Sequence, residues 1–222
     1  MKEFLSWFLV VEVVTAISFP FAFTFFSRLP DRGYSFAKVL GLLLIGFFLF
    51  TGATIGVISN SRGAVILILL VMAAAGAYLA ARRRDDVATF LAERWRYILL
   101  IEGLFFVTFV AALWLRSFVP DLSGTEKPSE FAFLNAVLRS DHFPAYDPWL
   151  ADFSLSYYYF GFVIMGSLMK LTGVPPEIGF NVAVALVAAL TCTAAFGVVY
   201  NLVRGAASEG RALAFGFVGL VF

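Results

Sequence analysis

Long apolar segments alternate with short polar connectors along nearly the whole chain. A helix needs about 20 apolar residues to cross the hydrocarbon core of a bilayer. Six segments meet or approach this length, at residues 4–26, 37–58, 63–81, 97–117, 157–172 and 179–203. A seventh begins near residue 212, and the sequence stops within it, so we expect a fragment of a longer protein. Since no alternating strand pattern is present, the sequence predicts an all-α, polytopic transmembrane helical bundle of about six to seven spans.

The composition also indicates an integral membrane protein. Hydrophobic residues make up 61% of the chain and charged residues 14%, whereas soluble domains are about 45–50% apolar and about 25% charged. The lipid bilayer is therefore the expected partner. Basic clusters with interleaved aromatics are missing, which argues against nucleic acid. Cys192 is the single cysteine and lies in an apolar run, so neither an intrachain disulfide nor metal-ligand spacing exists.

The arginines predict how the chain is oriented in the membrane. The connector at residues 82–96 contains Arg82, Arg83, Arg84, Arg94 and Arg96. Because basic residues concentrate in cytoplasmic loops, this connector is expected inside the cell. Alternation of the spans then places connector 27–38 inside and the N-terminus outside. The long loop at residues 118–156, where acidic residues outnumber basic ones, is expected outside.

The loop at residues 118–156 has internal structure of its own. Pro120 ends the preceding helix, and Pro128 suits the first turn of a new one. Apolar residues at Phe131, Leu134 and Leu138 share one face of that helix, which predicts an amphipathic helix along the outer membrane surface. Trp149 and Tyr157, Tyr158 and Tyr159 fall where an aromatic belt is expected.

Most of the candidate chemistry lies in this loop, which contains Asp121, Glu126, Glu130, Asp141, Asp147 and Asp152. Carboxylates at a membrane surface can act as a general base, hold a divalent cation or bind a cationic group. Lys127 and Arg139 can neutralise the phosphate of a lipid-linked donor. The alternative is that the acids are merely solvated and the tyrosines form only an interface girdle. His142, the only histidine, has no second histidine to complete a metal site.

Charged residues also occur within the predicted spans. Glu12 lies in the first span and Glu102 in the fourth, and intramembrane charge is a functional hypothesis by default. The structural alternative is that each is protonated or paired, with Glu102 reaching Arg94 or Arg96. Glu12 is expected nearer the outside and Glu102 nearer the inside. Lys170, near a span end, is expected to extend to the interface.

Several segments together resemble a known family. They are Leu-Pro-Asp-Arg-Gly-Tyr (29–34), Gly-Thr-Glu-Lys-Pro (124–128), Phe-Leu-Asn-Ala (133–136), Phe-Pro-Ala-Tyr-Asp-Pro-Trp (143–149) and Tyr-Tyr-Tyr-Phe-Gly (157–161). The chain resembles the tyrosine-triplet (YYY) membrane proteins of prokaryotes over most of its length. That family is in turn similar to the GT-C superfamily of multi-span glycosyltransferases, which take a sugar from a polyprenyl-phosphate donor.

The resemblance implies a membrane glycosyltransferase of the prokaryotic cell membrane. It implies that Glu126 is the catalytic acid of the external loop, as a general base or as the ligand of a possible divalent cation. Asp121 is the competing choice for this role, and Glu130 is expected to support Glu126. The implied substrate-binding residues are Lys127, Arg139, Asp147, Trp149, Tyr157, Tyr158 and Tyr159. Residues 1–96 would form an N-terminal three-span unit, and residues 97–222 would begin the GT-C-like domain.

The sequence also departs from the family pattern. GT-C enzymes commonly use aspartate where Glu126 stands, and here three spans precede the equivalent of their first span. Pro-Ser-Glu-Phe (128–131) replaces the usual Pro-Met-Asp-Phe, and Asp152 replaces a glycine. The alternative function is a non-enzymatic transporter or membrane scaffold that uses Glu12 and Glu102.

Overall fold

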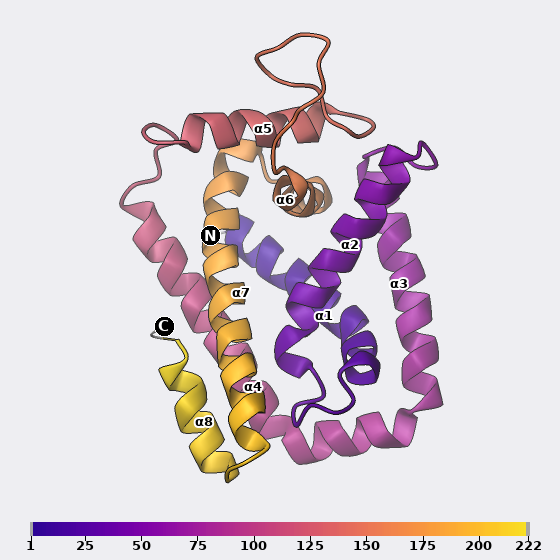
Figure 1. The fold of residues 1–222 in the computed structure, drawn as a ribbon, viewed down its shortest axis with the longest axis vertical. Helices are drawn as coiled ribbons and strands as arrows, with labels where there is room; N and C mark the ends of the chain where they lie inside the picture. The colour runs from indigo at the N-terminus through magenta and orange to yellow at the C-terminus, as the bar shows by residue number, and fades with distance from the viewer. Residues whose placement is uncertain (1, 221–222) are drawn as a thin grey trace.

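The structure is a computed structural model that describes residues 2–220, and within them all regular secondary structure is helical, without a β-strand. The helices are α1 (Lys2–Phe25), the 3-10 helix η1 (Tyr34–Phe36), α2 (Ala37–Thr54), α3 (Arg62–Arg82), α4 (Arg84–Ser117), α5 (Lys127–Arg139), α6 (Phe160–Thr172), α7 (Pro176–Arg204) and α8 (Glu209–Val218). Figure 1 shows α5 and α6 at one end of a bundle formed by the longer helices.

Five helical segments are long and apolar enough to cross a membrane: α1, η1 with α2, α3, α4 and α7. This confirms the predicted all-α membrane class. Apolar side chains on α3 and α4 remain largely uncovered, including Leu67, Leu70 and Val107. In water such surfaces would be unfavourable, so these helices present the faces that lipid chains would cover.

The segment expected to form a sixth span is a shorter helix. Only Phe160–Thr172 is helical, and 13 residues extend about 20 Å, less than the about 30 Å hydrocarbon core. Gly173, in the left-handed region at φ 72°, ends the helix. Figure 1 shows α6 nearly end-on beneath α5, so it runs across the bundle rather than along α7. Apolar composition predicted a span here because it cannot distinguish a buried crossing helix from a membrane-spanning one.

The predicted surface helix is present as α5, with Pro128 in its first turn. Its buried residues are Phe133, Leu134 and Val137, and Phe131 and Leu138 pack partly buried beside them. In Figure 1 it lies across the end of α7, so one face covers the bundle and the other faces away from it. This confirms an amphipathic helix at the end of the spans.

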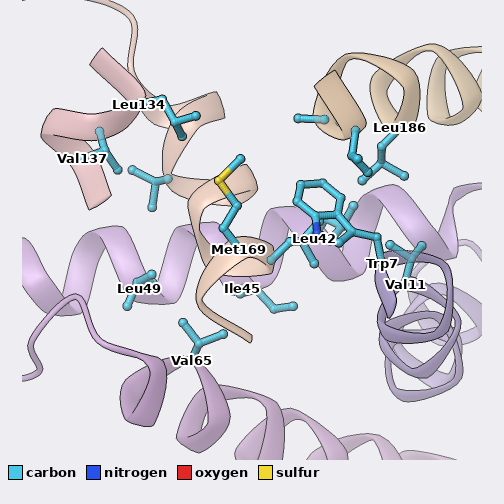
Figure 2. Close-up of a cluster of buried hydrophobic side chains, with 14 of the residues drawn as sticks. Trp7, Val11, Leu42, Ile45, Leu49, Val65, Leu134, Val137, Met169 and Leu186 are labelled. Carbon is cyan, nitrogen blue, oxygen red and sulfur yellow. The ribbon is translucent and has the colours of Figure 1, made fainter. Parts of the chain in front are cut away.

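A continuous apolar core attaches α5 and α6 to the spans (Figure 2). Met169 of α6 lies between the α5 residues Leu134 and Val137 and the α2 residue Ile45. Trp7 of α1, fully buried, lies beside Leu42 of α2. Because protein interiors are closely packed, α5 has a fixed position over the spans.

The connectors gather at two ends of the bundle. The end that contains residues 27–33, the α3–α4 junction and residues 205–208 is called the basic end; the opposite end, with residues 55–61, 118–159 and 173–175, is called the loop end. Which end faces the cytoplasm stays a prediction from the arginines. The boundary expected between residues 96 and 97 falls within α4, and the division into two units stays a prediction as well.

Candidate functional site

A cavity of about 370 Å³ lies at the loop end, between α5 and the loop that follows it. Its lining residues are Ala132, Asn135, Ala136, Arg139 and Ser140 from α5 and Tyr146, Asp147 and Pro148 from the loop. Two of the predicted binding residues, Arg139 and Asp147, therefore share one cavity. A guanidinium, a carboxylate, an amide and a phenol around one space can bind a ligand that carries both charge and hydroxyl groups.

Asp147 also holds the loop in shape. Its Oδ1 accepts hydrogen bonds from the backbone N–H groups of Trp149, at 2.8 Å, and Leu150, at 3.0 Å. Such a side-chain-to-backbone turn is typical of aspartate before a tight bend. The backbone N–H of Asp147 donates to the carbonyl of Phe153, and that of Leu155 donates to the carbonyl of Ala145. Asp147 thus lines the cavity and also holds the turn of the loop that forms one wall of the cavity.

The three predicted catalytic acids lie at or before the N-terminal end of α5, whereas the cavity is lined by residues from its middle and C-terminal end. Glu126 is exposed at the N-cap position, and Glu130 is in the first turn. Lys127 donates to the backbone carbonyl of the exposed Asp121 at 3.5 Å. None of these four residues lines the cavity. From Glu126 to Arg139 the helix rises about 20 Å, far beyond the about 3 Å reach of a base to the proton it abstracts, so the two cannot contact the same reacting atoms in this arrangement.

The possible divalent cation has no preformed site. Within residues 2–220 no three His, Cys, Asp or Glu side chains are grouped so that they could hold a metal ion. A cation at Glu126 would need most of its oxygen ligands from substrate and water. His142 is engaged locally, with its Nδ1 3.3 Å from the carbonyl oxygen of Ala53.

The tyrosine triplet is divided among three environments. Tyr157 stacks on the buried Phe133 ring at 4.7 Å, and Trp149 meets the same ring edge-on at 5.1 Å. Tyr159 packs against Phe50 and Phe143, and burial raises the pKa of its phenol. Tyr158 is 93% exposed. Tyr157 therefore packs the loop against α5 and Tyr159 packs it against α2, while the Tyr158 ring stays available for an external ligand.

Asn60, in the short connector between α2 and α3, is a structural centre that sequence reasoning missed. Its buried side-chain amide donates to the carbonyls of Val137, at 2.7 Å, and Ser140, at 2.8 Å. Its backbone N–H donates to the carbonyl of Asp141 at 2.7 Å. In the sequence this connector can be recognised only as a tight hairpin. The role of Asn60 is not visible there, because its partners lie about 80 residues away. These bonds satisfy the last carbonyls of α5 and fix the cavity end of that helix.

Lys170, predicted to extend to the interface, contacts the connector between α2 and α3 at the loop end. It is half-buried on α6 and donates a hydrogen bond to the backbone carbonyl of Asn60. Burial lowers the pKa of its ammonium to about 8, and the nearby Asp141 carboxylate opposes this shift. The position of Lys170 at the membrane interface stays a prediction.

A second group of polar residues lies inside the bundle, around Lys38. The Lys38 side chain is 2% exposed, and its Nζ is 2.5 Å from Glu102 Oε2 and 3.1 Å from Glu12 Oε2. Tyr34 donates its hydroxyl hydrogen to Glu102 Oε1 at 2.7 Å. Phe105 places its ring 4.8 Å from Nζ. We call Glu12, Tyr34, Lys38 and Glu102 the Lys38 cluster.

The Lys38 cluster corrects two predictions. Glu12 and Glu102 do not lie at different depths, because both contact the same ammonium group. Glu102 does not reach Arg94, which instead pairs with Glu209 at 2.8 Å. Lys38 lies at the end of the connector predicted at residues 27–38. Its spacing of four residues from Tyr34 places both on one helix face, and this signal could have indicated a shared partner.

Asp31 anchors the chain next to this cluster. Its carboxylate, 1% exposed, accepts hydrogen bonds from Gly33 N at 2.9 Å, from Ser35 N and Oγ at 3.2 and 2.6 Å, and from Tyr97 Oη at 3.1 Å. Gly33 has φ 75°, and a Cβ there would lie 2.5 Å from Phe26 Cδ2. The segment at residues 29–34 is therefore built to hold the start of η1, which presents Tyr34 to Glu102.

Comparison with known proteins identifies a family but no individual related protein. No curated protein and no solved structure matches the chain. A family model described as "Uncharacterized membrane protein (DUF2298)" matches residues 44–222. The match includes Glu102 and the whole loop end, while Glu12 and Lys38 precede it. Because the match extends over most of the sequence, the chain belongs to the DUF2298 family of membrane proteins.

Proposed function

We propose that the chain functions in a membrane glycosyltransferase that takes a sugar from a polyprenyl-phosphate donor at the outer membrane face. The observation that supports this best is the placement of α5. It lies across the loop end, attached to the spans through Leu134 and Val137, and it presents carboxylates and cations there. The headgroup phosphate of a lipid-linked donor lies at the surface of the bilayer, which is the level expected for a helix across the ends of the spans.

In this proposal the reacting groups lie at the start of α5. Glu126 takes the proton of an acceptor hydroxyl as the new bond to the sugar's anomeric carbon forms. The bond from that carbon to the phosphate oxygen breaks, and the polyprenyl phosphate leaves with the electron pair. Lys127, next in sequence, stabilises the negative charge on the departing phosphate. Glu130 and Asp121 are the alternative bases on the same part of the chain.

The cavity at the other end of α5 then binds a part of the substrate remote from the reacting bond. Arg139 and Asp147 provide its charges, and Asn135 and Tyr146 add polar groups. Contacts of this kind contribute to the rate when they orient the substrate for the transition state. Trp149 and Tyr158 are exposed residues of the loop end and offer aromatic faces at the membrane surface.

A cellular experiment tests this function. A strain that lacks the gene is expected to accumulate a lipid-linked sugar and to lose a surface glycan. The wild-type gene and a Glu177→Gln variant should both restore the glycan, and Glu126→Gln should not. Glu177 is a matched control because it is an exposed glutamate in the first turn of α7, also at the loop end. An unchanged lipid-linked sugar pool in the deletion strain would remove the basis of the proposal.

The second candidate function is a transporter or scaffold that uses Glu12 and Glu102. One observation favours it: both carboxylates contact the same Lys38 ammonium group inside the bundle. Solute uptake by proteoliposomes that is lost in both Glu12→Gln and Glu102→Gln, with normal glycan synthesis in cells, would favour this candidate over the transferase.

A further inference from the structure

The Lys38 cluster has one more carboxylate than its single ammonium can neutralise. Glu12, Lys38 and Glu102 come from α1, α2 and α4, and each lies within a predicted membrane span. Tyr34 contributes a neutral hydroxyl. With both carboxylates ionised, the cluster would carry a net charge of −1 in a low-dielectric region, and an unneutralised charge there is costly.

The two carboxylates are not equivalent in their hydrogen bonds. Glu102 accepts at both oxygens, with Oε2 receiving the Lys38 ammonium at 2.5 Å and Oε1 the Tyr34 hydroxyl at 2.7 Å. Donors to both oxygens favour the ionised form of a carboxylate. Glu102 is therefore the counter-ion of Lys38.

Glu12 lacks this support. Both of its oxygens lie 3.1 Å from Lys38 Nζ, but only Oε2 is aligned to accept a hydrogen bond. Glu12 Oε1 is buried and has no hydrogen-bond partner among the described residues. The charged groups that act on Glu12 are Lys38 and Glu102, and since these two neutralise each other, Glu12 carries the surplus charge.

We propose that the Lys38 cluster is a binding site for a single proton within the membrane, held on the carboxyl group of Glu12. A proton on Glu12 makes the cluster neutral while the Lys38–Glu102 pair stays intact. The inference does not rest on sugar transfer, because none of the cluster residues belongs to the loop end.

The same geometry argues against a metal cation as the ligand. A bound alkali or alkaline-earth ion needs several oxygen ligands around one centre. Lys38 Nζ already occupies the position between the two carboxylates, within 3.1 Å of each. The remaining space beside Glu12 Oε1 is buried. A proton needs no such coordination shell, and the Glu12 and Glu102 side chains are not fully enclosed by the protein, with 28% and 23% exposure.

Charge counting gives a distinct expectation for each variant. The full chain in lipid nanodiscs should show, at neutral pH, the infrared carbonyl stretch of one protonated carboxyl that disappears in Glu12→Gln. It should also disappear in Glu102→Gln, because Glu12 then becomes the counter-ion of Lys38. Lys38→Met should show one additional protonated carboxyl. Glu177→Gln, which changes an exposed glutamate, should leave the band unchanged.

The outcomes separate the proposal from its alternatives. If the wild type shows no band that either glutamine variant removes, both carboxylates are ionised and the proposal is wrong. If replacing choline by sodium in the buffer removes the band, the cluster binds a metal cation and the proton assignment is wrong. The two glutamine variants are nearly isosteric, so they provide the test even if Lys38→Met does not fold; size-exclusion chromatography and circular dichroism establish which variants are folded.

Discussion

Lys38 Nζ lies 2.5 Å from Glu102 Oε2, and the two residues are separated by 64 positions in sequence. This ion pair joins α2 to α4, which otherwise contact each other little compared with their other neighbours. Removing one partner of a buried pair costs about 3–5 kcal/mol, because the other charge is left unpaired. The pair is therefore a candidate determinant of how α4 is placed against the N-terminal helices.

Loss of the ammonium should destabilise the protein more than loss of the whole cluster. Lys38→Met leaves two carboxyl groups that must both take up a proton to become neutral, whereas the triple variant Lys38→Met, Glu12→Gln, Glu102→Gln has no titratable group left at these three positions. We expect the single variant to lower the thermal unfolding midpoint in detergent and the triple variant to recover much of that loss, since neutral replacements of buried ion pairs are tolerated. A triple variant less stable than the single one would contradict the electrostatic explanation.

Asn60 should control the order of the cavity end of α5. Asn60→Ala removes two hydrogen bonds and leaves the carbonyls of Val137 and Ser140 without their partner, with an expected cost of about 1–3 kcal/mol. Hydrogen exchange of residues 137–143 should accelerate. Asn135→Ala is the control, since Asn135 bonds only within its own helix, to Phe131; equal acceleration in both variants would contradict the role of Asn60.

Lys170 should give the protein a pH-dependent stability. Its pKa is about 8 in the folded protein and 10.5 as a free side chain. Between these values the unfolded chain binds more protons at Lys170 than the folded chain does, so the contribution of this residue to stability increases as pH rises from about 8 to about 10.5. Denaturation midpoints of the wild type and Lys170→Met, compared across this window, should diverge in favour of the wild type with rising pH. Parallel curves would show that Lys170 is not desolvated.

Asp147 can be separated into a structural and a charge role. Asp147→Asn keeps the Oδ1 acceptor for Trp149 N and Leu150 N but removes the charge from the cavity; Asp147→Ala removes both. We expect only the alanine variant to accelerate proteolysis within residues 146–154, and both variants to impair sugar transfer. Full transfer by Asp147→Asn would show that the carboxylate acts only by shaping the loop.

Much of the fold could be predicted from the sequence, because long apolar runs have few alternatives in a membrane. The spans formed by α1 to α4 and α7, and the surface helix after Pro128, follow from local pattern. The orientation of α6 does not, since it is set by contacts of Met169 with α2 and α5 (Figure 2). The convergence of Glu12 and Glu102 on Lys38 was missed because it joins three helices, and residue counts along single spans do not show such contacts.

The candidate site was predictable only in part. The sequence singled out Arg139 and Asp147, and these line one cavity. It also grouped them with Glu126, because a linear list of acids and bases does not show that α5 separates its two ends by about 20 Å. Asn60 was missed since a small polar residue in a hairpin carries no signal for a partner in a distant helix.

The most direct test of the proposed function is the release of polyprenyl phosphate from a lipid-linked sugar by the purified protein in proteoliposomes, with an acceptor extract from the same cells. The wild type and Glu177→Gln should release it at equal rates. Glu126→Gln should be slower by about 10²-fold or more, as expected for loss of a general base. Release by Glu126→Gln at the wild-type rate, or no release by any folded form, would contradict the account.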